Sequence, residues 1–357
     1  MADVIRVSLD VLRELAQASL TSRGVSDEQA NAIADCVVAA EGDNCPSHGL
    51  FRLPGYLKSV ISGKVDPVAL PKVTEIAPSV LHVDVRSGFA PLGHVVARAP
   101  AIAMARRQGV CAVAFVNSHH FSALWAELEP IAEEGIAGLA FRAGVSRVAP
   151  AGGVRPVFGT NPIGFAWPRN GRSPLVVDFA TSAIARGEIQ LRQKAGQQIP
   201  LDWAVDVDGN PTTDPARGLA GAQLTFGGYK GSALALMIEL LAGPLVGDLL
   251  SFEALRADNG DGGPPRGGEL LLLLDPSRFR RGEGQDPVLH AENLFALMAE
   301  QPGVRLPSER RYAARRTAVE HGVDISRKAL LEVAALAGDT VANRIKALLD
   351  SPEPVER

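Results

Sequence analysis

Cysteine is scarce in this chain of 357 residues, which contains only Cys36, Cys45 and Cys111. Three cysteines cannot all pair with one another, and their spacing is not that of a metal site. Proteins with few, unpaired cysteines are typical of reducing compartments. We therefore expect a cytoplasmic protein without a disulfide framework.

Long hydrophobic runs and blocks of like charge are also lacking. The longest apolar run, Gly231 to Leu250, contains Glu239, Pro244 and Asp248, which a membrane span would rarely combine. The first residues lack the basic and then apolar layout of a signal peptide. The net charge is −4, and no basic block is present to bind a phosphate backbone or an acidic membrane. We expect neither a nucleic-acid partner nor a membrane partner.

Several catalytic signatures are missing from the sequence. No G-x-G-x-x-G follows a predicted strand and no G-x-x-x-x-G-K-[ST] occurs, which excludes a standard Rossmann fingerprint and a P-loop. No H-E-x-x-H or C-x-x-C is present, so zinc hydrolysis is not expected and no metal site is assigned. The absence of G-x-S-x-G argues against an α/β-hydrolase.

The most informative stretch that is present runs from Asp43 to Tyr56. Pro46 suits the first turn of a helix, where its missing N–H would be unpaired anyway. A helix from about Ser47 to Tyr56 would put His48 and Arg52 on one face. A proton carrier would then lie one turn from a planar fork of donors that fits a carboxylate. The alternative is a surface histidine and a solvated arginine at a helix start.

The hydrophobic pattern predicts alternating helices and buried strands, and therefore an α/β fold with a mixed sheet. Helices are expected at residues 8–22, 26–40, 47–61, 93–107, 124–134, 231–241, 286–301 and 326–349. Strands are expected at residues 73–85, 110–116, 136–141, 175–180 and 269–275. The segment 150–168 is rich in Gly and Pro and is expected to be a fixed loop, and 258–268 a mobile one.

Three further segments carry candidate ligand contacts, each with a simpler alternative. One residue of the His119-His120 pair is expected to face a ligand while the other packs, although both could be metal ligands. The turn before Tyr229 and Lys230 suits a phosphate because a helix starts there, yet a capping turn would look the same. Arg305, Arg310 and Arg311 could hold a second phosphate or lie on the surface. Glu188 could assist His48 or be a solvated carboxylate.

Taken in order, these segments resemble one known family. Ser47-His48-Gly-x-x-Arg52, Ser118-His-His-Phe, Phe158-Gly-Thr-Asn-Pro, Asp178-x-Ala-Thr-Ser and Gly227-Gly-x-Lys-Gly occur as in the type-2 malate/L-lactate dehydrogenases. The likeness covers about residues 5–340. Within the family it is strongest to the branch that reduces Δ1-piperideine-2-carboxylate and Δ1-pyrroline-2-carboxylate. The resemblance implies a non-Rossmann NAD(P)-binding fold and a homodimer with its active site near the interface.

The resemblance also implies roles for individual residues. Ser47, His48 and Glu188 would form a proton relay, with Glu188 at a position where the imine reductases have Asp. Arg52 would bind the substrate carboxylate, assisted by Thr160 and by Arg186-Gly187, where the reductases have His-Gly. The cofactor would contact His120, Phe121, Ser122, Ala123, Leu124, Asp178, Phe179, Ala180, Tyr229, Lys230, Arg305, Leu306, Pro307, Ser308, Glu309, Arg310 and Arg311.

These implications lead to one expected function and two alternatives. The arginines near residue 310 favour NADPH over NADH, because a 2′-phosphate prefers guanidinium partners. We expect reduction of a cyclic 2-imino acid to L-proline or L-pipecolate, with Phe51, Leu53 and Trp125 packed against the ring. The alternatives are a 2-oxo acid reductase of the malate, lactate or ureidoglycolate type and a non-catalytic dinucleotide-binding protein. The expected domains are 1–45 with 305–350, 46–117 with 197–304, and a cofactor-binding domain at 118–196.

Overall fold

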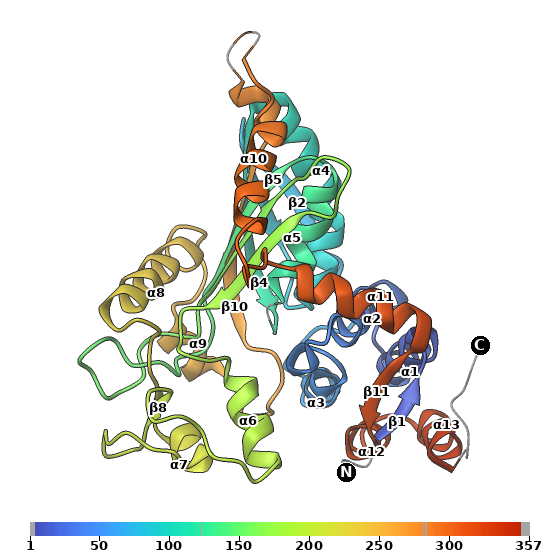
Figure 1. The fold of residues 1–357 in the computed structure, drawn as a ribbon. Coiled ribbons are helices and arrows are strands. Elements are labelled where there is room, and N and C mark those ends of the chain that lie inside the picture. Colours follow the sequence, from blue (N-terminus) through green and yellow to red (C-terminus); the bar gives the residue numbers. More distant parts are fainter. Residues whose placement is uncertain (1–3, 122, 281, 283, 351–357) are drawn as a thin grey trace.

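The computed structural model of the chain describes residues 4–121, 123–280, 282 and 284–350. Its centre is a seven-stranded sheet in the order β2-β3-β4-β10-β5-β6-β7 (Figure 1). The strands are β2 (Lys72–Ala77), β3 (Val80–Asp84), β4 (Val110–His119), β10 (Arg266–Leu274), β5 (Ala137–Arg142), β6 (Pro162–Trp167) and β7 (Leu175–Ala180). Within this sheet only β3 and β4 run parallel. The expected α/β class with a mixed, non-Rossmann sheet is confirmed.

Both faces of the sheet are covered, which explains why its central strands are almost continuously apolar. Leu271 and Leu273 of β10 point into one cluster with α4 (Ala90–Gln108) and α5 (Leu124–Glu133). Leu270 faces the other side and packs with α8 (Tyr229–Ala242). Strands that are buried on both faces form a rigid platform for the residues at their ends.

A second body is built from both ends of the chain, and we call it the terminal body. It contains β1 (Val4–Val7), α1 (Leu9–Thr21), α2 (Asp27–Gly42), α3 (Leu53–Ile61), α11 (Glu309–His321), β11 (Val323–Ser326), α12 (Arg327–Ala334) and α13 (Asp339–Asp350). The strands β1 and β11 pair antiparallel, and one hydrophobic core joins α1, α2 and α3 to α12 and α13. In Figure 1 this body lies beside the lower end of the sheet.

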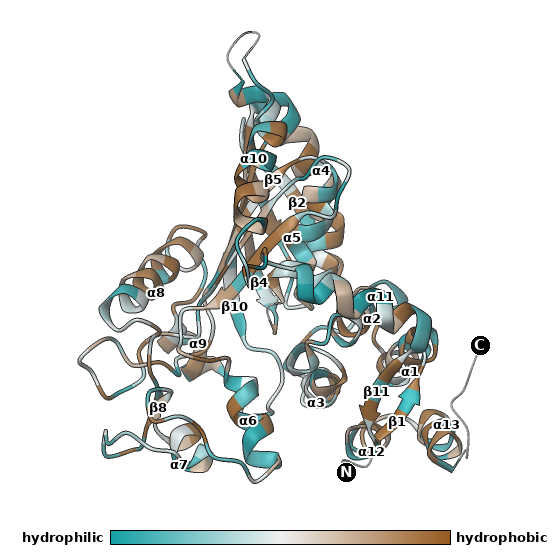
Figure 2. Cartoon of the chain, in the orientation of Figure 1, coloured by the Kyte–Doolittle hydropathy of each residue, from teal (hydrophilic) through white to brown (hydrophobic). Residues whose placement is uncertain are grey.

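The remaining elements complete the rim around the sheet. They are η1 (Pro46–His48), η2 (Leu50–Arg52), α6 (Arg186–Lys194), β8 (Ala204–Val205), α7 (Pro215–Ala220), β9 (Ala222–Gln223), α9 (Ser251–Ala257), η3 (Pro276–Phe279) and α10 (Pro287–Ala299). Figure 2 shows that α6 and α11 are largely hydrophilic, unlike the helices packed on the sheet. Polar helices therefore stand near the sheet without being buried in its core.

Three expected elements differ from the structure, and α11 is among the elements that were not expected. The helix expected over 47–61 is replaced at its start by two 3-10 turns, η1 and η2. The strand expected over 73–85 is a hairpin of β2 and β3. The loop expected over 150–168 gives way at Pro162 to the strand β6. Proline is tolerated at the first position of a strand, where its missing N–H removes no internal hydrogen bond of the ladder. No helix was expected at 309–321, where α11 has many arginines and no hydrophobic period.

The expected three-domain division stays a prediction. The sheet draws strands from two of the proposed domains, since β4 and β6 belong to the same seven-stranded layer. The terminal body agrees in content with the domain expected for residues 1–45 and 305–350, but α3 also packs into its core.

Candidate active site

One cavity of about 760 Å³ opens where the sheet meets the terminal body, and we call it the central cavity. It is bordered by η1 and η2, the start of α5, β7, the start of α6 and the segment before α11. Sixteen of the residues proposed from the sequence line it: Ser47, His48, Arg52, His120, Phe121, Trp125, Thr160, Asp178, Phe179, Ala180, Arg186, Glu188, Pro307, Ser308, Arg310 and Arg311. Residues far apart in the chain therefore meet at one site.

Other proposed residues lie outside the lining. Ala123, Leu124 and Leu306 are buried in hydrophobic clusters beneath it. Tyr229, Lys230, Arg305 and Glu309 are exposed. The turn before Tyr229 is still adjacent to the cavity, because Phe226 packs edge-on against Phe179 with ring centroids 5.7 Å apart. Ser122 lies outside the described residues.

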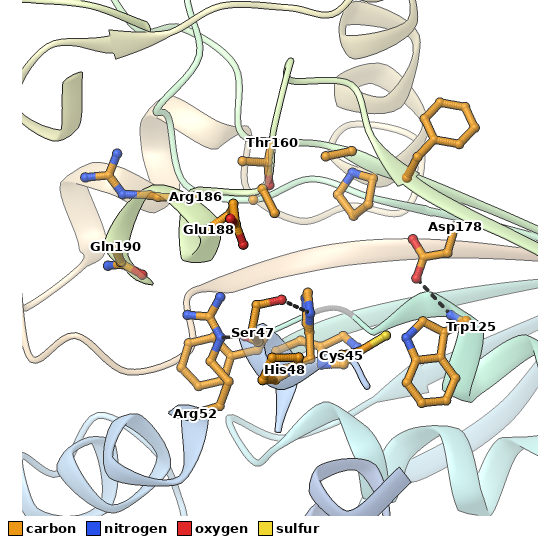
Figure 3. A pocket seen from close by; sticks show the side chains of 18 of the residues that line it. Cys45, Ser47, His48, Arg52, Trp125, Thr160, Asp178, Arg186, Glu188 and Gln190 are labelled. Atoms are coloured by element: carbon orange, nitrogen blue, oxygen red, sulfur yellow. Dashed lines mark hydrogen bonds between the residues drawn. The ribbon is translucent and has the colours of Figure 1, made fainter. Parts of the chain in front are cut away.

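Ser47 and His48 form the chemical centre of the lower wall (Figure 3). The Oγ of Ser47 lies 3.1 Å from Nδ1 of His48, which leaves Nε2 as the ring nitrogen for a ligand. Burial, reinforced by the positive charge of Arg52, lowers the pKa of His48 to about 3. In the free protein at neutral pH this histidine is therefore an uncharged imidazole hydrogen-bonded to a hydroxyl.

The two 3-10 turns that carry these residues are held by Glu41 of α2. Its Oε1 accepts the backbone N–H of Leu50 at 2.7 Å. A Cβ atom on Gly49 would lie only 2.1 Å from that oxygen, so the carboxylate reaches the backbone only because residue 49 is glycine. This tertiary contact breaks the expected continuous helix between His48 and Arg52.

Arg52 lines the central cavity, and its guanidinium is held by two contacts. Its Nε donates to the carbonyl oxygen of Ser47 at 2.7 Å, and its guanidinium stacks 4.6 Å from the ring centre of Phe121. Gly187 lies against this guanidinium, because an added Cβ there would lie 2.8 Å from Nη2 of Arg52. Among the described residues, neither terminal nitrogen of Arg52 has a hydrogen-bond partner. Both terminal nitrogens can therefore donate hydrogen bonds to a carboxylate.

Glu188 and Arg186 stand across the cavity from His48, at the start of α6 (Figure 3). Glu188 accepts a hydrogen bond from Nε of Arg192 at 3.2 Å. The Arg186 guanidinium donates to the carbonyl oxygen of Leu219 and is turned away from His48. The structure thus brings Glu188 into the same cavity as the Ser47–His48 pair, without a hydrogen bond to that pair among the described residues.

Thr160 is fixed by its neighbour Asn161, whose positive φ of 36° is unusual for a residue other than glycine. The Asn161 amide donates to Glu239 at 2.7 Å and accepts from the N–H of Gly144 at 3.2 Å. The carbonyl oxygen of Thr160 accepts from Thr181. These hydrogen bonds hold the backbone at Thr160 and Asn161 in one conformation, and they thereby fix the position of the Thr160 side chain.

Arg310 and Arg311 have different surroundings, which the sequence could not show. Arg311 contacts Asp43 at 3.1 Å and Glu129 at 3.4 Å, and it stacks on Trp125 at 4.7 Å. It belongs to a partly buried ion network completed by Arg315. Arg310 is exposed and lines the central cavity. It has no ion-pair partner within the described part of the chain.

Two wall features differ from the sequence-based expectation. Leu53 is fully buried in the terminal core, and neither it nor Phe51 lines the central cavity. Of the three apolar residues expected there, Trp125 does line the cavity, and Phe121 and Phe179 add to its apolar walls. Trp125 is anchored by its backbone N–H, which donates to Asp178 at 3.0 Å, and burial raises the pKa of Asp178 to about 6.

The loop after α9 closes the other side and was missed as a site element. Asp258, Gly262, Gly263 and Pro265 line the cavity. Lys64 is ion-paired to Asp258 at 2.6 Å and to Asp261 at 2.9 Å. The loop that looked mobile from its composition is thereby tied to the end of α3. In the sequence, the one feature of this loop that could have indicated a site was the presence of Asp258 and Asp261 among glycines.

Comparison with known proteins places this geometry in a family. The model of the malate/L-lactate dehydrogenase family matches residues 7–334. The chain belongs to this family. A Δ1-pyrroline-2-carboxylate reductase of Ancylobacter novellus is 49% identical over 94% of this chain and 98% of that protein. The solved structure of Δ1-piperideine-2-carboxylate reductase from Pseudomonas syringae pvar. tomato is 40% identical, with a TM-score of 0.87 over 93% of this chain and 99% of that one.

Relatives with other substrates are also close. A (2R)-3-sulfolactate dehydrogenase (NADP+) of Chromohalobacter salexigens is 45% identical over 87% of this chain and 92% of that protein. Membership of a dehydrogenase family implies an oxidoreductase with a nicotinamide cofactor and a small-molecule substrate. The family expected from the motifs is confirmed. The roles assigned to single residues remain predictions.

Proposed function

We propose that this family member is an NADPH-dependent reductase of cyclic 2-imino acids that forms L-proline or L-pipecolate. The observation that supports it most is that one cavity contains an uncharged His48 and the guanidinium of Arg52, whose terminal nitrogens have no hydrogen-bond partner among the described residues. The names of the relatives that share most of the chain point the same way.

The charge state of His48 suits an imine better than a ketone. A cyclic imine is activated when its nitrogen is protonated, and it can bring that proton from water. A 2-oxo acid instead needs a strong acid near its oxygen when the alkoxide develops. A neutral His48, hydrogen-bonded to Ser47, can accept a hydrogen bond from a protonated ring nitrogen and exchange its proton through the hydroxyl. Arg52 would fix the substrate carboxylate and so orient the C=N bond.

The central cavity fits a nicotinamide cofactor. Its volume lies within the roughly 300–1,000 Å³ common for ligand sites, and its walls combine aromatic rings with buried polar atoms. When bound, that cofactor supplies the hydride. Residues His120, Phe121, Asp178, Phe179, Ala180, Pro307, Ser308 and Arg310 would hold it, and the aromatic walls would exclude water.

Arg310 supports NADPH as the preferred form. It is the arginine of the 305–311 segment that lines the cavity while keeping its charge unpaired among the described residues. A 2′-phosphate is a natural partner for such a guanidinium. The ion network of Arg311 with Asp43 and Glu129 makes that residue a poorer candidate.

A 2-oxo acid reductase is the second candidate, favoured by the sulfolactate dehydrogenase relative. A non-catalytic dinucleotide-binding protein is the third. The deciding experiment is NADPH oxidation by the purified protein with Δ1-pyrroline-2-carboxylate, with L-proline identified as product by chiral chromatography. Turnover that yields L-proline supports the first proposal. Cofactor binding without turnover on any imino or oxo acid would support the third.

A homodimer and a cytoplasmic location belong to the same proposal. Exposed leucines on α8 and α10, such as Leu240 at 54% and Leu297 at 61%, are unusual for a monomer surface when they recur along a helix.

All three cysteines are free, as expected in a reducing compartment. No helix in the described ranges is long and apolar enough to cross a membrane.

A further inference from the structure

Four buried ionisable side chains meet behind the central cavity, each from a different part of the fold. They are His94 of α4, His120 after β4, Glu127 of α5 and Glu269 of β10, and each is at most 6% exposed. One possible ligand atom from each side chain lies within 4.8 Å of the other three. We call these residues the histidine–glutamate cluster. Of the four, His120 alone also lines the central cavity, so the cluster lies behind the lining rather than within it.

The polar atoms inside the cluster lack hydrogen-bond partners. Among the described residues, no partner is found for Nε2 of His94, for Oε2 of Glu127 or for either carboxylate oxygen of Glu269. Buried polar atoms in native proteins are nearly always hydrogen-bonded, and buried charges are paired or coordinate a metal. Four unpartnered atoms in one place therefore indicate a ligand that can contact several of them at once.

The nearby guanidinium of Arg142 does not fill this role. Its Nη1 lies 3.7 Å from Oε2 of Glu269, which is beyond hydrogen-bond range. Its terminal nitrogens donate instead to the hydroxyl of Ser118 at 2.9 Å and to the carbonyl oxygen of Ser118 at 3.2 Å. With both histidines neutral and both glutamates ionised, one buried negative charge stays uncompensated. The cluster therefore has room for a further cation.

The spacing of the ligand atoms distinguishes a proton on His94 from a metal ion. A protonated Nε2 would restore neutrality, but it would form a short bond of about 2.7–2.9 Å to one oxygen. Nε2 of His94 instead lies 3.3 Å from Oε1 of Glu269 and 3.5 Å from Oε2 of Glu127. A four-coordinate zinc ion with bonds of about 2.0–2.2 Å holds its ligand atoms roughly 3.3–3.6 Å apart. Both observed separations fall in that range.

His120 completes the donor set. Its Nε2 is hydrogen-bonded to Oε1 of Glu127, so the rings of His94 and His120 both face the Glu127 carboxyl group. Two imidazoles and two carboxylates suit Zn²⁺ and other divalent first-row ions. Four protein ligands leave no open position for a substrate, which is the arrangement of structural rather than catalytic zinc.

We propose that His94, His120, Glu127 and Glu269 form a buried structural site for a divalent transition-metal ion, with Zn²⁺ as the best fit. The ion would join α4, α5 and β10 behind the central cavity and hold His120 in the cavity wall. It would supply no step of the reaction. The inference needs neither the substrate nor the nicotinamide cofactor, so it stands or falls independently of the proposed function.

Zinc binding by the full-length protein tests the site. The purified protein is dialysed against a chelator and titrated with Zn²⁺ by calorimetry, and the metal retained after gel filtration is counted by mass spectrometry. We expect one Zn²⁺ per chain and a rise in melting temperature of at least about 3 °C, because the ion binds the folded state. A wild-type protein that retains no zinc would overturn the proposal.

Two variants assign the binding to the cluster. His94→Asn and Glu127→Gln each remove a ligand and should weaken zinc binding at least about a hundredfold, since losing an outer-shell partner alone costs about 10–100-fold. His321→Asn is the matched control, because it removes an exposed histidine that lies 3.7 Å from Glu320. It should bind zinc like the wild type. Equal affinities in all three variants would place the ion elsewhere and overturn the assignment.

A second measurement needs no variant. Four-coordinate Co²⁺ absorbs visible light far more strongly than six-coordinate Co²⁺, so its spectrum reports the number of ligands. We expect the wild-type protein loaded with Co²⁺ to show the intense four-coordinate bands, and added Zn²⁺ to remove them by displacement. Weak six-coordinate bands would indicate ions on the surface and would overturn the proposed site.

Discussion

His48 carries the central chemical assignment, since its Nε2 is the ring nitrogen not engaged by Ser47. We predict that His48→Ala reduces kcat by about two to four orders of magnitude, the usual effect of removing a proton-transfer group. The Kd for NADPH should change little. Stopped-flow kinetics and calorimetry would measure the two effects separately. Near-normal turnover in the variant would remove His48 from the mechanism.

Arg52 tests the carboxylate anchor. Arg52→Lys keeps the charge but loses the two-pronged donor fork and the stacking on Phe121. We predict a loss in kcat/KM of roughly 1–3 kcal/mol, the scale of a hydrogen bond to a charged group. The loss should be found for imine substrates with a carboxylate and be smaller for the same ring without one. A uniform loss for both compounds would assign Arg52 a structural role.

Arg310 and Arg311 form a matched pair of neighbours with different surroundings. Arg310→Gln should raise KM for NADPH about tenfold, equivalent to roughly 1.4 kcal/mol, and leave NADH nearly unaffected. Arg311→Gln should lower the melting temperature and impair both cofactors, because Asp43 and Glu129 lose a partner. Steady-state kinetics with both cofactors would distinguish them. If Arg311→Gln alone removes the NADPH preference, the assignment of the phosphate to Arg310 is wrong.

At the scale of elements, the turn at Gly49 decides how His48 and Arg52 face the cavity. Gly49→Ala would place a methyl group 2.1 Å from Glu41 Oε1, so the turn or the α2 side chain must shift. We predict a destabilisation of about 1–3 kcal/mol, the usual cost of overpacking, and at least about a tenfold loss of kcat/KM. Thermal unfolding and kinetics measure both.

Gly42→Ala is the matched control, because the added Cβ would meet Leu9 at an ordinary 3.6 Å and the residue is helical. It should leave activity unchanged. Equal behaviour of the two variants would show that Glu41 does not organise the turn.

Local motifs predicted much of the site because its key residues are close in sequence. Ser47, His48 and Arg52 are within six positions, and the apolar run of β10 could only be a buried strand. The ion network was invisible, since Arg311 and Asp43 are 268 residues apart. The break at Gly49 also depends on a tertiary contact, with Glu41. Contacts of this kind carry no periodic signal, which is why the continuous helix was expected.

For the whole molecule, a group of buried ionisable side chains shows the same limit. His94, Glu127, Arg142 and Glu269 come from four different elements that the sheet and its helices bring together. Each residue alone looks like an ordinary charged position in an amphipathic pattern. The fold class could be derived from hydrophobic runs, whereas the electrostatic environment of the cavity depends on the order of strands in the sheet.

The central claim is that the cavity is built for a substrate that brings its own activating proton. The most direct measurement is kcat/KM for Δ1-pyrroline-2-carboxylate and Δ1-piperideine-2-carboxylate against pyruvate and oxaloacetate, at matched low concentrations with NADPH. We predict that the better imine exceeds both oxo acids by at least about tenfold, or roughly 1.4 kcal/mol of transition-state stabilisation. Faster reduction of either oxo acid than of both imines would contradict the account.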